Sequence, residues 1–261
     1  KDQLWSEKTA VLTSATLAVN GSMDFTRRDL GIDDAGAAIL PSPFKYAQQC
    51  ALYLPDGLPD PNSEQFAYLI AEEIERVLHR SQGRAFVLFT SYKNMRAIAD
   101  SLIPRLPFPC RVQGELPRQR LIEWFKETEN SVIFATSTFW EGIDIPGESL
   151  SCVIMDKIPF MPPGDPVHQA QVDFIKAQGR DWFSDLALPQ AVIRLKQGFG
   201  RLIRGETDRG VVALLDSRVH SRGYGQRLLS QLPEAKRVVD QQQRIVPFGK
   251  AQQLGQRRDV A

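Results

Sequence analysis

Short runs of apolar residues alternate along the chain with stretches in which apolar positions recur every three or four residues. The runs are rich in β-branched and aromatic side chains and are bounded by Gly, Pro or polar residues, which is typical of buried strands. They predict strands at 84–89, 109–113, 131–135, 150–155 and 210–215, the last being the final strand of the chain.

The periodic stretches predict helices between these strands, at 64–79, 93–103, 116–126, 167–177 and about 190–203. Ser63 is the expected N-cap of the first helix, and Pro104 is expected to end the second. Continuously apolar strands need cover on both faces of their sheet. The pattern therefore predicts a three-layer α/β domain, with a mainly parallel sheet, helices on both faces and right-handed crossovers.

Three segments depart from this alternation. Residues 157–188 open with closely spaced Pro and Gly and are expected to be an insertion between two core strands. From Glu234 onward the chain is rich in Gln and Arg, which predicts a weakly packed helix or a mobile end. The chain opens on Lys1 and enters an apolar run at Ala10, so we expect it to be part of a longer protein.

Composition narrows the class of protein. The 261 residues are 43% apolar and 24% charged, which suits one large or two small soluble domains. A net charge of +1 excludes a uniformly basic nucleic-acid binder but not a local basic patch. No apolar run reaches the length of about 18 residues that a membrane span needs, so no membrane partner is expected. Three widely spaced cysteines form no metal motif and suit a reducing, cytoplasmic compartment.

Polar residues follow two of the predicted strands, where parallel sheets bind their ligands. Thr90, Ser91 and Tyr92 lie between a strand and a helix, which favours either a phosphate site or an ordinary N-cap. Thr136 opens a second such turn, in which Trp140 could stack on a base or pack in the core.

A third segment carries Gln197, Arg201 and Arg204. On a helix their spacing of four and three residues predicts that all three project from one face. The region 190–227 holds eight Lys or Arg and three Asp or Glu, so it is locally basic. A solvated basic helix face is the alternative interpretation.

Four segments together resemble the motifs of a helicase family, in the expected order. Residues 13–17 (TSATL) resemble motif III, 89–92 motif IV, 139–144 (FWEGID) motif V and 197–204 (QGFGRLIR) motif VI. With 188–193 (LPQAVI), they resemble most closely the bacterial DinG and YoaA branch of the XPD-like, superfamily 2 DNA helicases.

The resemblance implies a RecA-like fold and the second of two RecA-like motor domains of an ATP-driven 5′ to 3′ helicase. On this basis residues 1–20 would be the motif III and hinge segment, 21–232 the second motor domain, and 233–261 a polar tail. Neither a phosphate loop nor an Asp-Glu dipeptide is present, so ATP and Mg would be held mainly by a first domain. The chain alone should be inactive, and the cysteines of the family's iron–sulfur cluster would lie upstream.

The resemblance also implies roles for individual residues. Arg201 and Arg204 would be catalytic arginine fingers that reach toward ATP on the other domain. Gln197 would help to sense the phosphate, and Gly142 and Asp144 would bind the nucleotide or couple it to the DNA side. The residues implied to contact single-stranded DNA, without reading its sequence, are Thr90, Ser91, Tyr92, Thr136 and Trp140.

The expected partners are single-stranded DNA, the N-terminal RecA-like domain of the same protein, and a replication or repair protein. Two alternatives stay open at this point. The chain could be a non-catalytic nucleic-acid or protein-binding module on a RecA-like scaffold, or the two arginines could form a structural salt-bridge network.

Overall fold

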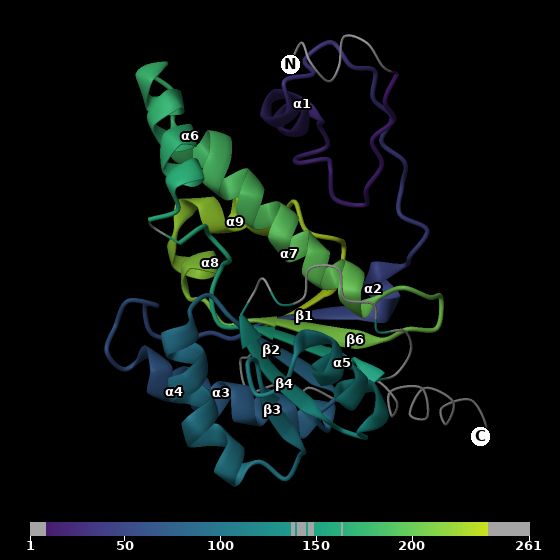
Figure 1. Ribbon diagram of the computed structural model, residues 1–261, viewed down its shortest axis with the longest axis vertical. Helices are drawn as coiled ribbons and strands as arrows, with labels where there is room; N and C mark the ends of the chain where they lie inside the picture. The colour runs from purple at the N-terminus through teal and green to yellow at the C-terminus, as the bar shows by residue number, and fades with distance from the viewer. Residues whose placement is uncertain (1–8, 137–138, 140–144, 146–148, 163, 240–261) are drawn as a thin grey trace, which may run out of the picture.

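A parallel β-sheet forms the centre of the computed structural model, which describes residues 9–136, 139, 145, 149–162 and 164–239 (Figure 1). Within these residues seven strands pair in the order β3-β4-β2-β5-β6-β1-β7, and every pairing is parallel. The strands are β1 Cys50–Leu54, β2 Ala85–Phe89, β3 Cys110–Val112, β4 Val132–Thr136, β5 Cys152–Met155, β6 Gly210–Leu214 and β7 Lys236–Val239. The predicted α/β class is confirmed.

The central strands are apolar at every position because both of their faces are covered. In β2, Phe86 and Leu88 belong to one hydrophobic cluster, while Val87 and Phe89 belong to a second cluster on the opposite face. Successive side chains of a strand point to opposite faces, so a strand covered twice needs no polar position. This explains the continuous apolar runs in the sequence.

Helices form the two outer layers. Residues of α3 and α4 pack in one cluster, and residues of α5, α7 and α9 pack in the other (Figure 1). The helices are α1 Asp24–Leu30, α2 Tyr46–Gln49, α3 Phe66–Ser81, α4 Tyr92–Leu102, α5 Arg118–Glu127, α6 Pro166–Ala177, α7 Leu188–Leu202, α8 Arg218–Ser221 and α9 Gly223–Leu229. A 3-10 turn at Ile103–Arg105 contains Pro104 and follows α4, close to the predicted end.

Some local predictions were wrong. α3 begins at Phe66, and Ser63 does not cap it, because Ser63 belongs to a preceding turn in which its carbonyl accepts the Phe66 amide hydrogen. The strand at Gly210–Leu214 is not the last, since β7 follows within the segment that was predicted as a loose helix or mobile end. β7 adds to the free edge of β1, a strand that the sequence analysis had not singled out.

The insertion between β5 and α7 contains the predicted helix, α6, and a π-helical turn at Phe183–Ala187. At the other end of the chain, residues 9–18 form neither helix nor strand. This N-terminal segment contacts the domain through the Lys196 ammonium of α7, which donates a hydrogen bond of 3.0 Å to the carbonyl oxygen of Ala18. The segment therefore lies against the helix that carries the basic motif.

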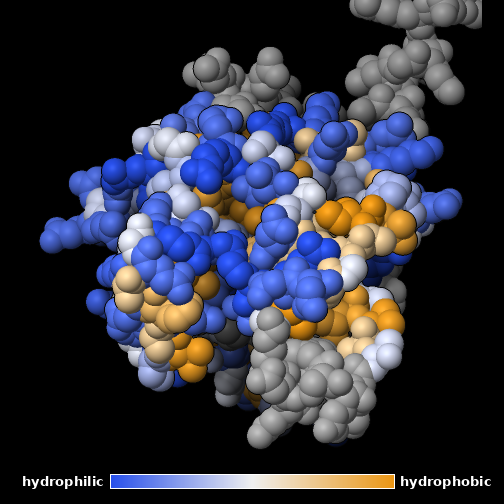
Figure 2. Space-filling model, turned by 90° about the horizontal axis from the view of Figure 1, so that it is seen from above, coloured by the Kyte–Doolittle hydropathy of each residue, from blue (hydrophilic) through white to orange (hydrophobic). Residues whose placement is uncertain are grey.

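The surface of the described residues is mainly hydrophilic on the face in Figure 2, with hydrophobic patches between the polar side chains. None of the helices in these residues is long and apolar enough to cross a membrane.

Candidate functional site

A row of polar side chains lies along the carboxyl edge of the sheet. Each member stands at the end of a strand or just beyond it: Gln113 after β3, Thr136 at the end of β4, Thr90 after β2, Asp156 after β5 and Asp216 after β6. Because β3, β4, β2, β5 and β6 are successive neighbours in the sheet, these five residues follow one another along the edge. This edge is where open α/β sheets bind their ligands.

Gln113 brings two of the predicted DNA-contacting residues together. Its Oε1 accepts hydrogen bonds from the backbone amide of Thr136 at 2.7 Å and from the Thr136 hydroxyl at 3.0 Å. Its Nε2 donates to the Tyr92 hydroxyl at 2.9 Å. Tyr92 itself is 55% exposed, so its ring is open to a ligand. Gln113 was not predicted as a site residue, although it ends the run that was predicted as a strand.

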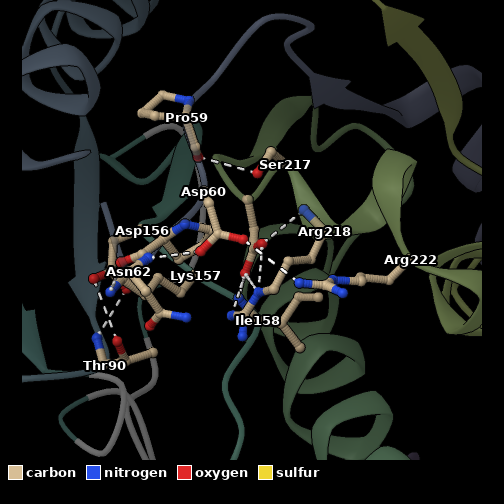
Figure 3. Close-up of polar contacts among 12 residues, drawn as sticks. Pro59, Asp60, Asn62, Thr90, Asp156, Lys157, Ile158, Ser217, Arg218 and Arg222 are labelled. Carbon is tan, nitrogen blue, oxygen red and sulfur yellow. Dashed lines mark hydrogen bonds and ion pairs between the residues drawn. The ribbon is translucent and has the colours of Figure 1, made fainter. Parts of the chain in front are cut away.

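The turn between β2 and α4 is held by its own hydroxyl groups. The Ser91 oxygen accepts the Asn94 amide hydrogen at 3.2 Å and so caps α4, as the alternative interpretation had it. That bond uses a lone pair and leaves the Ser91 hydroxyl hydrogen able to donate to a phosphate oxygen. Thr90 differs, because its amide donates to Asp156 Oδ1 at 2.9 Å and its hydroxyl to Oδ2 at 3.3 Å (Figure 3).

Asp156 is a fully buried carboxylate, with 0% of its surface exposed. Burial raises its pKa to about 6, against the opposing effects of the Thr90 hydrogen bonds and the Lys157 charge. Asp156 was not predicted as a site residue, since its partner Thr90 is 66 residues away along the chain. The only local signal is a carboxylate directly after an apolar strand.

Asp216 extends the row to β6 and is equally enclosed, with 1% of its surface exposed. It accepts the Ile158 amide hydrogen at 2.8 Å and pairs with the Arg218 guanidinium at 2.6 Å. It therefore joins the end of β6 to the segment that follows β5. Asp216 was not predicted as a site residue either.

The loop between β1 and α3 crosses the ends of β5 and β6 (Figure 3). The Lys157 ammonium donates to the Pro61 carbonyl at 2.8 Å, and the Ser217 hydroxyl donates to the Pro59 carbonyl at 3.0 Å. These bonds fasten the loop to the same carboxyl edge. The edge thus holds a hydrogen-bonded loop on the β5–β6 side and carries the exposed Tyr92 on the other.

The basic motif does not have the geometry that its spacing predicted. Gln197 and Arg201 lie on α7, but this helix ends at Leu202 and Ile203 is extended. Arg204 therefore stands in the loop after the helix instead of on a shared helix face. Burial lowers the pKa of the Arg204 guanidinium, and the charge of Asp208 opposes that shift.

Asp208 also organises the backbone of this loop. Its Oδ2 accepts the amide hydrogens of Arg204 at 2.8 Å and of Gly205 at 2.7 Å. One carboxylate oxygen thus closes the turn that carries Arg204, immediately before β6 begins. Two guanidinium groups at the end of a helix can hold a polyanion such as a nucleotide triphosphate.

Three predicted site residues, Trp140, Gly142 and Asp144, lie outside the described residues. Where the structure does describe the chain, no group of three or more His, Cys, Asp or Glu could hold a metal ion. The cysteines in it are free thiols, and burial raises the pKa of Cys50 and Cys152 to about 12.

Comparison with known proteins assigns the fold and the family. Residues 74–235 match the model of the helicase C-terminal domain. The chain is 43% identical over 230 residues to the ATP-dependent DNA helicase YoaA of Haemophilus influenzae, an alignment that covers 88% of this chain and 36% of that protein. It is 37% identical over 245 residues to the ATP-dependent helicase DinG of Mycobacterium tuberculosis, with 88% and 35% covered.

The fold is that of solved XPD helicases. A structure described as XPD helicase superposes with a TM-score of 0.58 at 20% identity, over 74% of this chain and 36% of that one. The chain thus spans about a third of the length of the relatives it matches. Its sheet and helices are those of a RecA-like domain, and its sequence is similar to the YoaA and DinG helicases. The chain belongs to the helicase C-terminal domain family.

Proposed function

We propose that this chain is the C-terminal motor domain of an ATP-dependent 5′ to 3′ DNA helicase that translocates on single-stranded DNA. The observation that carries the proposal is the position of Arg201 and Arg204 at the end of α7, with the second arginine in a loop closed by Asp208. Both would act as fingers on ATP held mainly, with Mg, by an N-terminal RecA-like domain. The names of the YoaA and DinG relatives support ATP-dependent helicase activity.

The arginines would contribute electrostatically. In phosphoryl transfer, negative charge spreads over the γ-phosphate oxygens. An arginine finger stabilises that charge and so raises the rate by a factor on the order of 10³ to 10⁵. Gln197, one turn before Arg201 on α7, would contact the same phosphate. Gly142 and Asp144 of the FWEGID segment complete the proposed nucleotide side.

The DNA would lie along the carboxyl edge on the α4 side. There the Ser91 hydroxyl can donate to a phosphate oxygen, and the exposed Tyr92 ring can stack on a base or sugar. Thr136 would lie beside the DNA strand, held there by its hydrogen bond to Gln113. Trp140 is proposed as a second residue that stacks on a base. Thr90 would shape the turn, since both of its donors are directed at Asp156. Such contacts are sequence-independent.

The test is the ATP hydrolysis that single-stranded DNA stimulates in the full-length protein. Replacing Arg204 by Ala is expected to lower kcat by a hundredfold or more, which is about 2.7 kcal/mol of transition-state stabilisation. Arg227→Ala, an exposed arginine of the same basic region, is the control and should hydrolyse ATP like the wild type. A folded Arg204→Ala protein with normal turnover would refute the finger and favour a binding module or a structural arginine.

The DNA side has its own test in the same protein. Tyr92→Ala should weaken the binding of single-stranded DNA about fivefold or more, because stacking on an aromatic ring contributes about 1–3 kcal/mol per base. Tyr68→Ala is the control, since Tyr68 is an exposed tyrosine on α3, 67% exposed against 55% for Tyr92. Equal affinity of the two variants would show that the strand does not pass α4. Strand displacement on substrates with a 5′ or a 3′ overhang tests the polarity.

The proposed setting is DNA repair or replication in the bacterial cytoplasm, with a replication or repair protein as a further partner. The bacterial origin of the YoaA and DinG relatives supports this setting. Pull-down from a bacterial lysate, followed by competition with single-stranded DNA, would identify partners that bind elsewhere than the DNA.

A further inference from the structure

A buried glutamine lies against the loop that carries Arg204. Gln49 ends α2, is only 3% exposed, and places its Nε2 2.8 Å from the carbonyl oxygen of Gly205. The same nitrogen lies 3.2 Å from the carbonyl oxygens of Glu206 and Asp208. The two N–H hydrogens of one side-chain amide thus serve three carbonyl groups, one hydrogen being shared between two of them, in a loop more than 150 residues away in sequence.

The other end of this amide fixes its orientation. Gln49 Oε1 accepts the Lys45 amide hydrogen at 2.8 Å, so oxygen and nitrogen each face a partner of the correct type. The residue is also placed by the sheet, because Cys50 directly follows it and is in register with Gly210, the first residue of β6. Gln49 therefore stands beside the loop where the loop enters β6.

Gln49 and Asp208 hold complementary groups of the loop. Asp208 accepts two amide hydrogens, those of Arg204 and Gly205, and Gln49 donates to three carbonyl groups between Gly205 and Asp208. A loop outside helix and sheet has no hydrogen-bond ladder of its own, so bonds from side chains set its shape. Both residues bind the backbone next to Arg204, and the Asp208 charge also acts on the Arg204 guanidinium.

We propose that Gln49 is a positioning residue for Arg204 and that Asp208 assists it from within the loop. The proposal rests on the proposed function, in which Arg204 acts on ATP. A finger works only when its charge meets the transition state, and a displacement of about 1 Å can cost a hundredfold in rate. Gln49 ties that position to the α2–β1 junction, which the motif around Arg204 does not include.

The experiment measures DNA-stimulated ATP hydrolysis by the full-length protein. Gln49→Glu keeps the size of the side chain but replaces the donating amide by a carboxylate that the three carbonyl groups repel. We expect kcat to fall at least tenfold, while KM for ATP and the DNA concentration for half-maximal stimulation stay within twofold. Gln48→Glu, the same change at the exposed neighbour, should leave all three parameters unchanged.

A pair of Asp208 variants gives a second line of evidence. They test whether the hydrogen bonds that shape the Arg204 loop set kcat, also if Gln49→Glu does not fold. Asp208→Ala should lower kcat in the same way, and Asp208→Asn should restore it to within about threefold, because one amide oxygen can still accept both hydrogens. Equal kcat for the Ala and Asn variants would overturn the proposal.

Measurements in the Arg204→Ala variant separate the positioning role of Gln49 from the proposed function of Arg204 as an arginine finger. There, Gln49→Glu should cause no further loss of kcat, since the group that it positions is gone. Normal kcat in a folded Gln49→Glu protein, with Arg204→Ala inactive, would overturn the positioning role alone. Normal kcat in Arg204→Ala itself would instead overturn the proposed function.

Discussion

The buried carboxylate of Asp156 makes the stability of the domain depend on pH. Its pKa is raised from 3.8 to about 6, a difference of about 2 pH units, and each unit corresponds to 1.36 kcal/mol. The full difference is about 3 kcal/mol, an upper value because the neighbouring structure can relax around the charge. Replacing Asp156 by Asn removes the titration and keeps the shape of the side chain.

The sign follows from the two states. Well below pH 3.8 the carboxyl is protonated in both the folded and the unfolded chain, so it contributes no pH dependence. Between about pH 4 and 6 the unfolded chain is largely ionised while the folded domain still retains the proton, and stability falls as pH rises. Well above pH 6 both states are ionised and the destabilisation is complete.

Urea denaturation from pH 4 to 7.5 measures this difference. The free energy of unfolding of the wild type should fall relative to that of Asp156→Asn by up to about 3 kcal/mol between pH 4 and 6.5, and then level off. Asp100→Asn, an exposed carboxylate on α4, corrects for the general effect of removing a negative charge. A difference between the wild type and Asp156→Asn that does not change with pH would refute this reasoning.

Two further predictions test the packing that supports the site. Gly83→Ala should destabilise the domain by about 2 kcal/mol or more, because Gly83 has a φ of 68° and a Cβ there would lie 2.0 Å from the carbonyl oxygen of Asn130; no change in the urea midpoint would contradict the close approach. Phe86→Ala should lower the free energy of unfolding by about 3–5 kcal/mol, because Phe86 is 1% exposed and its ring centroid lies 4.7 Å from that of Phe125. Phe174 is 65% exposed, so Phe174→Ala should change the free energy of unfolding by no more than about 0.5 kcal/mol. Similar losses in both would show that burial does not set the effect.

Local sequence pattern was sufficient for most of the helices and strands. A strand such as β2 is recognisable because both of its faces are buried, so each position is apolar whatever lies beside it. A helix such as α4 is recognisable because its buried positions, among them Met95, Ile98, Ala99 and Leu102, recur with the helical period. The hydroxyl of Ser91 capped its helix as the residue type favours.

β1 was overlooked although it is continuously apolar, whereas two other features that the sequence missed depend on a neighbour in space. β7 is a strand because the edge of β1 is available to it, although the surrounding segment is polar. Arg204 left the predicted helix face because Asp208 binds its amide and closes a turn there. The spacing of the residues predicted a helix that continues past Leu202, because spacing contains no information about the turn that Asp208 closes.

The candidate site divides in the same way. The amino-acid sequence by itself determined the α/β class, the motifs and the residue types that could bind phosphate and DNA, because these depend on short-range pattern. Only the tertiary structure decided that Gln113 joins Tyr92 to Thr136, that Asp156 holds Thr90, and that Gln49 holds the Arg204 loop. These contacts join segments that are distant in the chain, so they exist only once the order of the strands has brought their ends together.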